Sequence, residues 1–133
     1  MKLSHWVGFG AFASIISVPA ALAHHSNAMF DDTKQVEVAG TVQEFQWTNP
    51  HVFIELMVDG PNGPYKFIIE GPTPGVLRGH EWKFNSLKAG DKIVATVRPL
   101  REGNSGGYLV SVMKNGMPIG DGGTSSATIT GNK

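Results

Sequence analysis

The chain of 133 residues contains no cysteine. This absence excludes disulfide bonds, zinc–thiolate and iron–sulfur centres, and a cysteine nucleophile. The chain also lacks an excess of charge of either sign, because 11 basic residues balance 11 acidic ones. Without net charge it has no long-range field that would attract a nucleic-acid backbone, so we expect no nucleic-acid partner. The length suits one small domain, whose stability must come from a packed core alone.

Long apolar runs are lacking except at the amino terminus. Trp6–Val18 is an uncharged, mostly apolar run that follows Lys2 and ends before Pro19, and Ala21-Leu22-Ala23 has the small–x–small pattern that signal peptidase prefers. We therefore predict a signal peptide over residues 1–23, export to the periplasm of a Gram-negative cell, and no transmembrane span after cleavage. The alternative is an uncleaved anchor, but the run is shorter than the roughly 20 residues that cross a bilayer.

After this segment the chain changes from polar to strand-like. Residues 24–35 are mostly polar, and we expect them to form an amino-terminal arm laid over the domain. Residues 36–117 contain five stretches in which apolar and polar residues alternate, which is typical of half-buried strands. The alternating residues are, strand by strand, Val36, Val38, Gly40 and Val42; Val52, Ile54, Leu56 and Val58; Tyr65, Phe67 and Ile69; Ile93, Ala95 and Val97; and Tyr108, Val110 and Val112. Val58 is expected on the inner face of its strand, and the residues predicted to be buried are Val42, Val52, Ile54, Leu56, Phe67, Ile69, Ile93, Ala95, Val97 and Val110.

Breaks in the alternation mark where strands bend or end. The apolar phase shifts from Val42 to Phe45, which predicts a β-bulge near Gln43-Glu44. Asp59–Pro64 is dense in Gly, Pro, Asn and Asp, and it predicts a hairpin loop. Glu102–Gly107 is rich in glycine and predicts a second loop ahead of the last strand.

One short helix and a tail complete the expected elements. Thr73 ahead of a proline offers a helix cap, so we predict a short helix over Pro74–Arg78. Trp82 and Phe84 are expected to close one end of the fold beneath this helix. Residues 118–133 offer almost nothing to bury, and we predict a disordered tail.

The order of these elements indicates the fold. Five short strands with one helix between the third and the fourth predict an all-β protein, a small OB-like barrel over residues 36–117. An SH3-like barrel or a small sandwich is the alternative, because strand number and spacing alone do not separate these folds. The position of the helix favours the OB-fold.

Several short motifs carry a family resemblance. They are His24-His25-Ser26, Met29-Phe30-Asp31, Gly40-Thr41-Val42, Phe45–His51, Ile69-Glu70-Gly71, Ser86–Asp91 and Pro99–Gly103. With these motifs the chain resembles the exported bacterial proteins of domain-of-unknown-function family 6152, over residues 24–115. The resemblance implies export and a small β-barrel, and it implies no catalytic residue.

The histidines at the predicted mature terminus are a candidate metal site. After cleavage, His24 would supply an α-amino group and an imidazole, as in histidine-brace copper sites, whereas His25 would offer an amine–amide–imidazole chelate. Nitrogen-rich tetragonal ligation suits Cu(II). His51 would complete the nitrogen set if the arm folds back to the second strand. The alternative is that His24 and His25 form only a polar start of the mature chain.

A second candidate site lies at the start of the second strand. The face of strands two and three is the usual ligand surface of OB barrels. His51 has the parity opposite to Val52, so it shares the outward face. The alternative is that His51 bonds a nearby carbonyl and caps the strand. The candidate ligand-binding residues are Trp47, Asn49, His51, Phe53 and Glu55.

Signals of catalysis are lacking. The sequence has no Gly-x-Ser-x-Gly elbow and no phosphate-binding loop. Its acidic residues fall on different strands, so we interpret them as solvent-facing or as salt-bridge partners of Arg98 and Arg101 rather than as a glycosidase pair. The sequence therefore predicts a non-enzymatic binding module for an envelope protein or a small ligand. A periplasmic copper-binding protein is the alternative and a hydrolase a third. The acidic residues are Asp31, Asp32, Glu44, Glu55 and Glu70.

Truncation of the chain after Gly120 should leave the melting temperature nearly unchanged. Beyond this residue only Ile129 is a sizeable apolar side chain, too little to offset the entropy of ordering about a dozen residues. Thermal unfolding of the truncated and full-length proteins checks this. A drop of more than a few degrees would mean that the tail docks, for instance as an additional strand.

Overall fold

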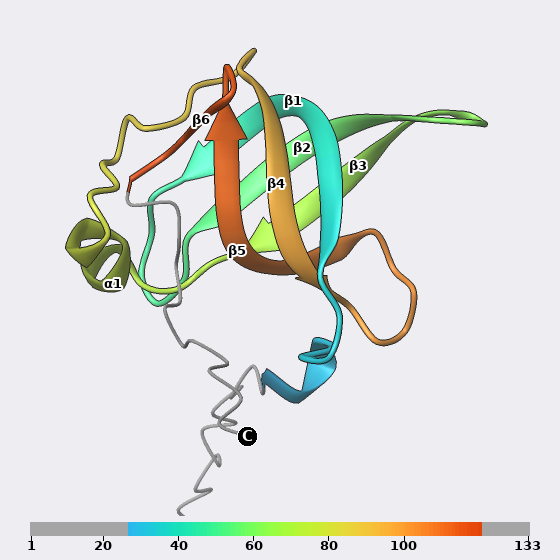
Figure 1. Ribbon diagram of the computed structural model, residues 1–133, viewed down its shortest axis with the longest axis horizontal. Helices are drawn as coiled ribbons and strands as arrows, with labels where there is room; N and C mark the ends of the chain where they lie inside the picture. The colour runs from blue at the N-terminus through green and yellow to red at the C-terminus, as the bar shows by residue number, and fades with distance from the viewer. Residues whose placement is uncertain (1–26, 121–133) are drawn as a thin grey trace, which may run out of the picture.

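Alternating apolar residues build one sheet that closes on itself. The computed structural model describes residues 27–120, which Figure 1 shows in colour. The chain runs through a 3-10 turn (Asn27–Met29), β1 (Val36–Gln46), β2 (Phe53–Gly60), β3 (Gly63–Glu70), α1 (Pro74–Gly79), β4 (Lys92–Pro99), β5 (Gly106–Lys114) and β6 (Met117–Pro118).

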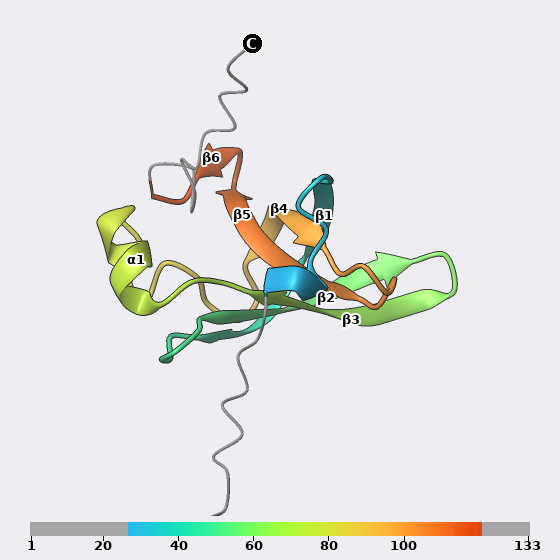
Figure 2. The same ribbon diagram turned by 90° about the horizontal axis from the view of Figure 1, so that it is seen from below.

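The pairing of the strands defines an OB-type barrel. The sheet order is β3-β2-β1-β4-β5-β6, and a parallel pairing of β3 with β5 closes five strands into a barrel. The helix lies between β3 and β4, so the predicted all-β fold is confirmed. Both views place α1 at one end of the barrel and the tip of the β2–β3 hairpin at the other (Figures 1 and 2). Within residues 27–120, no helix is long and apolar enough to cross a membrane.

Two β-bulges let single strands serve two sides of the barrel. On β1, Val42 lies opposite Leu56 and Glu44 opposite Glu55, so Gln43 is the extra residue and the predicted bulge is confirmed. On β5, the partners shift from Thr96↔Ser111 to Val97↔Leu109, which leaves Val110 as the extra residue.

The second bulge overturns part of the predicted inward set. It reverses the phase of β5, so Leu109 is buried with Val112, whereas Val110 and Tyr108 are only partly buried. Val110, which was predicted to be buried, is therefore a wrong prediction, and the alternating residues Val36 and Tyr65, near strand ends at the rim, are 39% and 41% exposed. The remaining inward predictions with side chains are confirmed. The buried core consists of Val38, Val42, Val52, Ile54, Leu56, Val58, Phe67, Ile69, Leu77, Trp82, Leu87, Ile93, Ala95, Val97, Leu109 and Val112.

The helical connection covers one end of this core. The Thr73 hydroxyl accepts a hydrogen bond from the backbone N–H of Val76 at 3.2 Å, which confirms the predicted cap, and Leu77 of the helix is buried. Trp82 is buried as expected. Phe84 is not, because it lies in the tight turn that the hydrogen bond from Ser86 N–H to the Lys83 carbonyl closes, and it is 72% exposed.

Both predicted loops are shorter than expected. The hairpin strands continue to Gly60 and from Gly63, which leaves a turn of Pro61-Asn62. At the other loop, β5 already begins at Gly106, which pairs with Ile68 of β3. The lack of a side chain matters here, because a Cβ on the next residue, Gly107, would lie 2.7 Å from Val97 Cγ2.

The first three residues of the segment predicted to be a disordered tail, 118–120, belong to the described structure. Pro118 belongs to β6, and the N–H of Ile119 donates to the Val112 carbonyl at 2.9 Å while its side chain packs against the core. The following residues, 121–133, lie outside the described residues, as do residues 1–23 with the predicted signal peptide and the histidines His24 and His25.

Replacing Ile54 with alanine should lower the free energy of unfolding by roughly 2–5 kcal/mol, because it leaves a cavity in a core without disulfides. Ile54 is 1% exposed. Urea denaturation measures the loss. The matched control is Ile68→Ala on the outer face of the neighbouring strand, where Ile68 is 36% exposed and the loss should be clearly smaller. Equal losses would contradict the assigned core.

Candidate functional site

The outer face of β2 and β3 gathers most of the candidate ligand-binding residues. Burial alternates along β2, with Ile54 and Leu56 inside and Phe53 and Glu55 partly exposed. The hairpin register sets Phe53 opposite Glu70 and Glu55 opposite Ile68. We call His51, Phe53, Glu55, Ile68 and Glu70 the β2–β3 face.

His51 is held by two contacts of one ring nitrogen. Its Nδ1 lies 3.0 Å from the Gly71 carbonyl oxygen and 3.4 Å from Glu70 Oε1. A carbonyl oxygen only accepts, so Nδ1 carries the proton in this contact and the lone pair of the neutral ring is on Nε2. The strand-capping alternative therefore has its hydrogen bond, and the same bond fixes the tautomer.

Glu70 lies between this histidine and β5, the strand whose parallel pairing with β3 closes the barrel. Its side chain is only 12% exposed, and on β3 it lies between Phe53 of β2 and Tyr108 of β5. Burial raises the pKa of the Tyr108 hydroxyl above its usual value, and the negative charge of Glu70 raises it further. His51, Glu70 and Tyr108 thus form a partly buried row from the connection before β2, through β3, to β5.

A shallow hollow lies next to this row. It has a volume of about 190 Å³ and is lined by Gln46, Phe53, Glu55 and Ile68. The Phe53 ring also meets the His51 ring, with centroids 6.5 Å apart. Glu55 is paired with Lys66, whose Nζ lies 2.7 Å from Oε1. The hollow therefore offers an apolar floor between a histidine and an ion pair.

The other two candidates lie elsewhere. Trp47 packs against the core side of the barrel beside Phe45, with ring centroids 5.7 Å apart, and the Arg78 guanidinium lies 5.6 Å from the Trp47 ring. Asn49 is exposed in the connection between β1 and β2, where its bond to Pro50 is cis. The structure brings together His51, Phe53 and Glu55 and separates Trp47 from them.

The amino-terminal arm docks near the same row. The rings of Phe30 and Tyr108 lie 5.4 Å apart, and Phe30 forms a bridge with Leu100 at the end of β4. The N–H of Asp31 donates to the Pro99 carbonyl, and that of Arg101 to the Met29 carbonyl, at 2.8 and 2.9 Å. The described part of the arm therefore reaches the strand next to Glu70.

Four of the five acidic residues singled out from the sequence form ion pairs. Asp32 lies 3.4 Å from Arg98 and Asp31 lies 4.0 Å from Arg101, as the sequence suggested. Glu70 differs from the expectation, because it pairs with a histidine and not with an arginine. Residues 27–120 hold no group of three His, Cys, Asp or Glu side chains that could bind a metal on their own.

Some residues of the face were not among the sequence candidates. Ile68, Glu70 and Gln46 lie beside Phe53 because of the hairpin register and the bulge in β1. The sequence signal for the first two was Pro61-Asn62-Gly63, because proline is favoured at the first central position of a turn and glycine at its last position, and a turn at Pro61-Asn62 fixes the register of the strands on both sides.

The closed barrel, its pairing order and its outer β2–β3 face define an OB-type β-barrel protein. The chain belongs to a family of unknown function (DUF6152), whose model matches residues 13–110, from the amino-terminal apolar run to the middle of β5. No curated protein matches the chain.

Proposed function

We propose that the protein is an exported, non-enzymatic binding module that binds an envelope protein on its β2–β3 face. The observation that carries this proposal is the hollow beside Phe53, on the surface that OB barrels commonly use for ligands, next to the partly buried pair of His51 and Glu70. Export is supported by the pattern of residues 1–23, which lie outside the described residues.

The size of the hollow favours a protein over a small molecule. Pockets for drug-sized ligands hold roughly 300–1,000 Å³ and enclose most of the ligand. The hollow beside Phe53 has about 190 Å³, which suits one inserted side chain. Its neighbours Ile68, 36% exposed, and the ion pair of Glu55 with Lys66 would form the surrounding contact surface.

A photo-crosslinking residue at position 68 should give one discrete protein adduct in cells that express the protein. Ile68 borders the hollow, so a bound partner must lie within reach of it. The matched position is Phe84, which is more exposed but lies in the turn near α1 and should not give this adduct. Adducts are read by mass spectrometry.

Charge reversal tests whether the adduct depends on the face. Glu55→Lys replaces the ion pair with Lys66 by two like charges and should abolish the adduct, whereas Glu102→Lys in the exposed loop before β5 should retain it. The proposal fails if position 68 gives no adduct, or if the adduct persists in Glu55→Lys.

A copper-binding function is the second candidate, and the contact of His51 favours it. Histidines that bind metals usually donate the other ring N–H to a carbonyl or a carboxylate, and His51 Nδ1 meets both in Gly71 and Glu70. The arm is held at Phe30, against Tyr108 and one strand away from Glu70. His24 is six residues upstream, a reach of roughly 20 Å, so its amine and imidazole could meet His51.

Correctly processed protein should bind one Cu(II) with a nitrogen-rich electron paramagnetic resonance spectrum. A variant with one alanine placed before His24 should lose this site, because the terminal amine is displaced. His51→Ala should weaken binding and His80→Ala, at the end of α1, should not. Equal binding by the processed and the extended proteins would remove the amino-terminal chelate, and equal binding by His51→Ala would remove the fold-back.

A further inference from the structure

β1 and β2 are hydrogen-bonded to each other along only part of their lengths. β1 pairs with β2 only from Thr41↔Met57 to Gln46↔Phe53, and its first half, Val36–Thr41, pairs with β4. Beyond Met57, β2 continues to Gly60 with β3 as its partner. The hairpin of β2 and β3 accordingly projects away from β1 (Figure 1). We call the space between Glu37–Gly40 and Val58–Gly60 the β1–β2 wedge.

The register shows which backbone groups of β1 face the wedge. Val42 bonds toward the β4 side, since its N–H donates to the Asp91 carbonyl and its carbonyl accepts from Gly90 N–H, both at 2.8 Å. Along a strand, the N–H and C=O of successive residues alternate between the two edges. Thr41, Ala39 and Glu37 therefore point to the opposite edge, where Thr41 meets Met57.

The same rule applies to β2. Val52 bonds toward β3, because its carbonyl accepts from the Gly71 N–H and its N–H donates to the Pro72 carbonyl. Met57 and Asp59 therefore face the β1 side. Within residues 27–120, no strand pairs with Ala39 and Glu37 on that edge, or with Asp59 opposite them. Such an unpaired edge is a template for a further strand.

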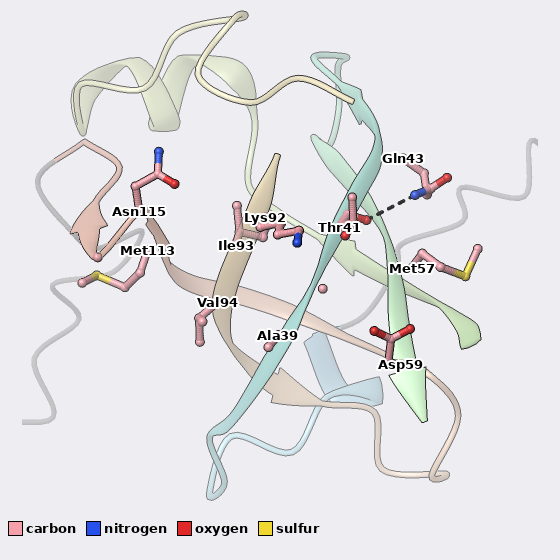
Figure 3. A pocket seen from close by; sticks show the side chains of 12 residues that line it. Ala39, Thr41, Gln43, Met57, Asp59, Lys92, Ile93, Val94, Met113 and Asn115 are labelled. Carbon is pink, nitrogen blue, oxygen red and sulfur yellow. Dashed lines mark hydrogen bonds between the residues drawn. The ribbon is translucent and has the colours of Figure 1, made fainter. Parts of the chain in front are cut away.

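The outer surface beside the wedge is an apolar groove of about 880 Å³. Figure 3 shows Met57 and Asp59 of β2 on one side of β1, and Val94 of β4 on the other. Ala39 pairs with Val94 and Val94 with Met113, which gives an apolar row across three strands. Val94 and Met113 are 37% and 38% exposed, so this row is open to a partner.

Charge indicates the chemistry of the occupant. Glu37 and Asp59 are exposed on the two sides of the wedge, and neither forms an ion pair within the described chain. The cation that lines the groove, Lys92, lies opposite Thr41, at the end of the wedge where β1 and β2 pair. The two carboxylates at the open end favour a partner with basic side chains there. They disfavour a second copy of this chain, which would bring the same acidic residues together.

We propose that the β1–β2 wedge is a docking site for an extended, basic segment of a partner protein, which adds as a strand to the edge of Glu37 and Ala39. Main-chain hydrogen bonds to this edge would hold the segment. Its basic side chains would lie on the outer face, with their charges near Asp59 and Glu37 and their aliphatic stems against Ala39 and Met57, and its apolar side chains would point to the opposite face. The wedge is separate from the β2–β3 face, so this proposal stands without the function proposed above.

The test uses a synthetic peptide of four Val-Lys repeats with blocked ends as the probe. The peptide should bind the purified protein saturably, and nuclear magnetic resonance should show the largest shifts at the amides of Ala39 and Asp59. The matched peptide carries N-methyl groups on alternate residues, which remove hydrogen bonds from one edge. It should bind at least about tenfold more weakly, since each lost hydrogen bond is worth up to that factor.

Protein variants test the same edge by changing β1 instead of the peptide. Ala39→Pro removes an N–H that points away from β4, so the barrel ladder is kept, and binding should fall about tenfold. Phe84→Ala, in the exposed turn near α1 and outside the groove, is the control and should bind as the parent does. If Ala39→Pro fails to fold, the N-methylated peptide on the parent protein decides.

Three results would overturn the proposal. They are absence of binding, equal binding of the methylated peptide, and a concentration-dependent dimer that sedimentation detects and that Ala39→Pro abolishes. The last would assign the edge to a second copy of the chain. Weaker binding of the lysine peptide by Glu37→Gln with Asp59→Asn, together with unchanged binding of a Val-Ser peptide, supports the basic character of the partner.

Discussion

The structure depends on the bend of β1. This strand pairs with β4 along its first half and with β2 along its second, so it joins the two parts of the sheet. Gly40 lies at the change of partner, where a Cβ would meet the Met57 carbonyl oxygen at 2.7 Å. The bulge at Gln43 then turns the inward side from Val42 to Phe45.

The same bend creates both of the surfaces to which we assign binding. Past the bulge, Gln46 comes to lie opposite Phe53 and completes the hollow on the β2–β3 face. Before the bend, β1 has moved away from β2, so the edge at Ala39 and Asp59 stays open. A barrel with a straighter first strand would fill the wedge and lose the hollow. Closure of the core and exposure of the two surfaces therefore have one geometric origin.

The sequence predicted a bulge only where polar residues marked the break in the apolar alternation. The bulge in β1 was predictable because Gln43 and Glu44 are polar and break the apolar alternation. The bulge in β5 was hidden, because Leu109, Val110 and Val112 are all apolar and both phases look equally buried. Hydrophobicity alone does not tell which of these side chains points inward. The pairing of β5 with β4 decides it.

Contacts between distant segments were the least predictable. Reading Asp59–Pro64 as one loop concealed the register that sets Phe53 opposite Glu70. Phe84 was expected inside because it is aromatic, but the backbone of its tight turn directs it outward. The meeting of Phe30 with Tyr108 depends on where the arm crosses the end of β4, and local sequence has no signal for that.

His51 shows why a structural and a functional interpretation of one residue need not compete. Its Nδ1 contact with the Gly71 carbonyl joins the start of β2 to the end of β3, and the backbone bonds between Val52 and Gly71 lie beside it. A capping role alone explains the carbonyl contact. It does not require Glu70, a carboxylate that is 12% exposed, lies 3.4 Å from the same nitrogen and is paired across the hairpin with Phe53. A largely buried carboxylate loses part of its hydration, which costs free energy. A contact between His51 and the Gly71 carbonyl alone would not carry this cost. The pair of His51 and Glu70 is therefore the feature of this face that strand capping alone leaves unexplained, and the binding role that we propose rests on it.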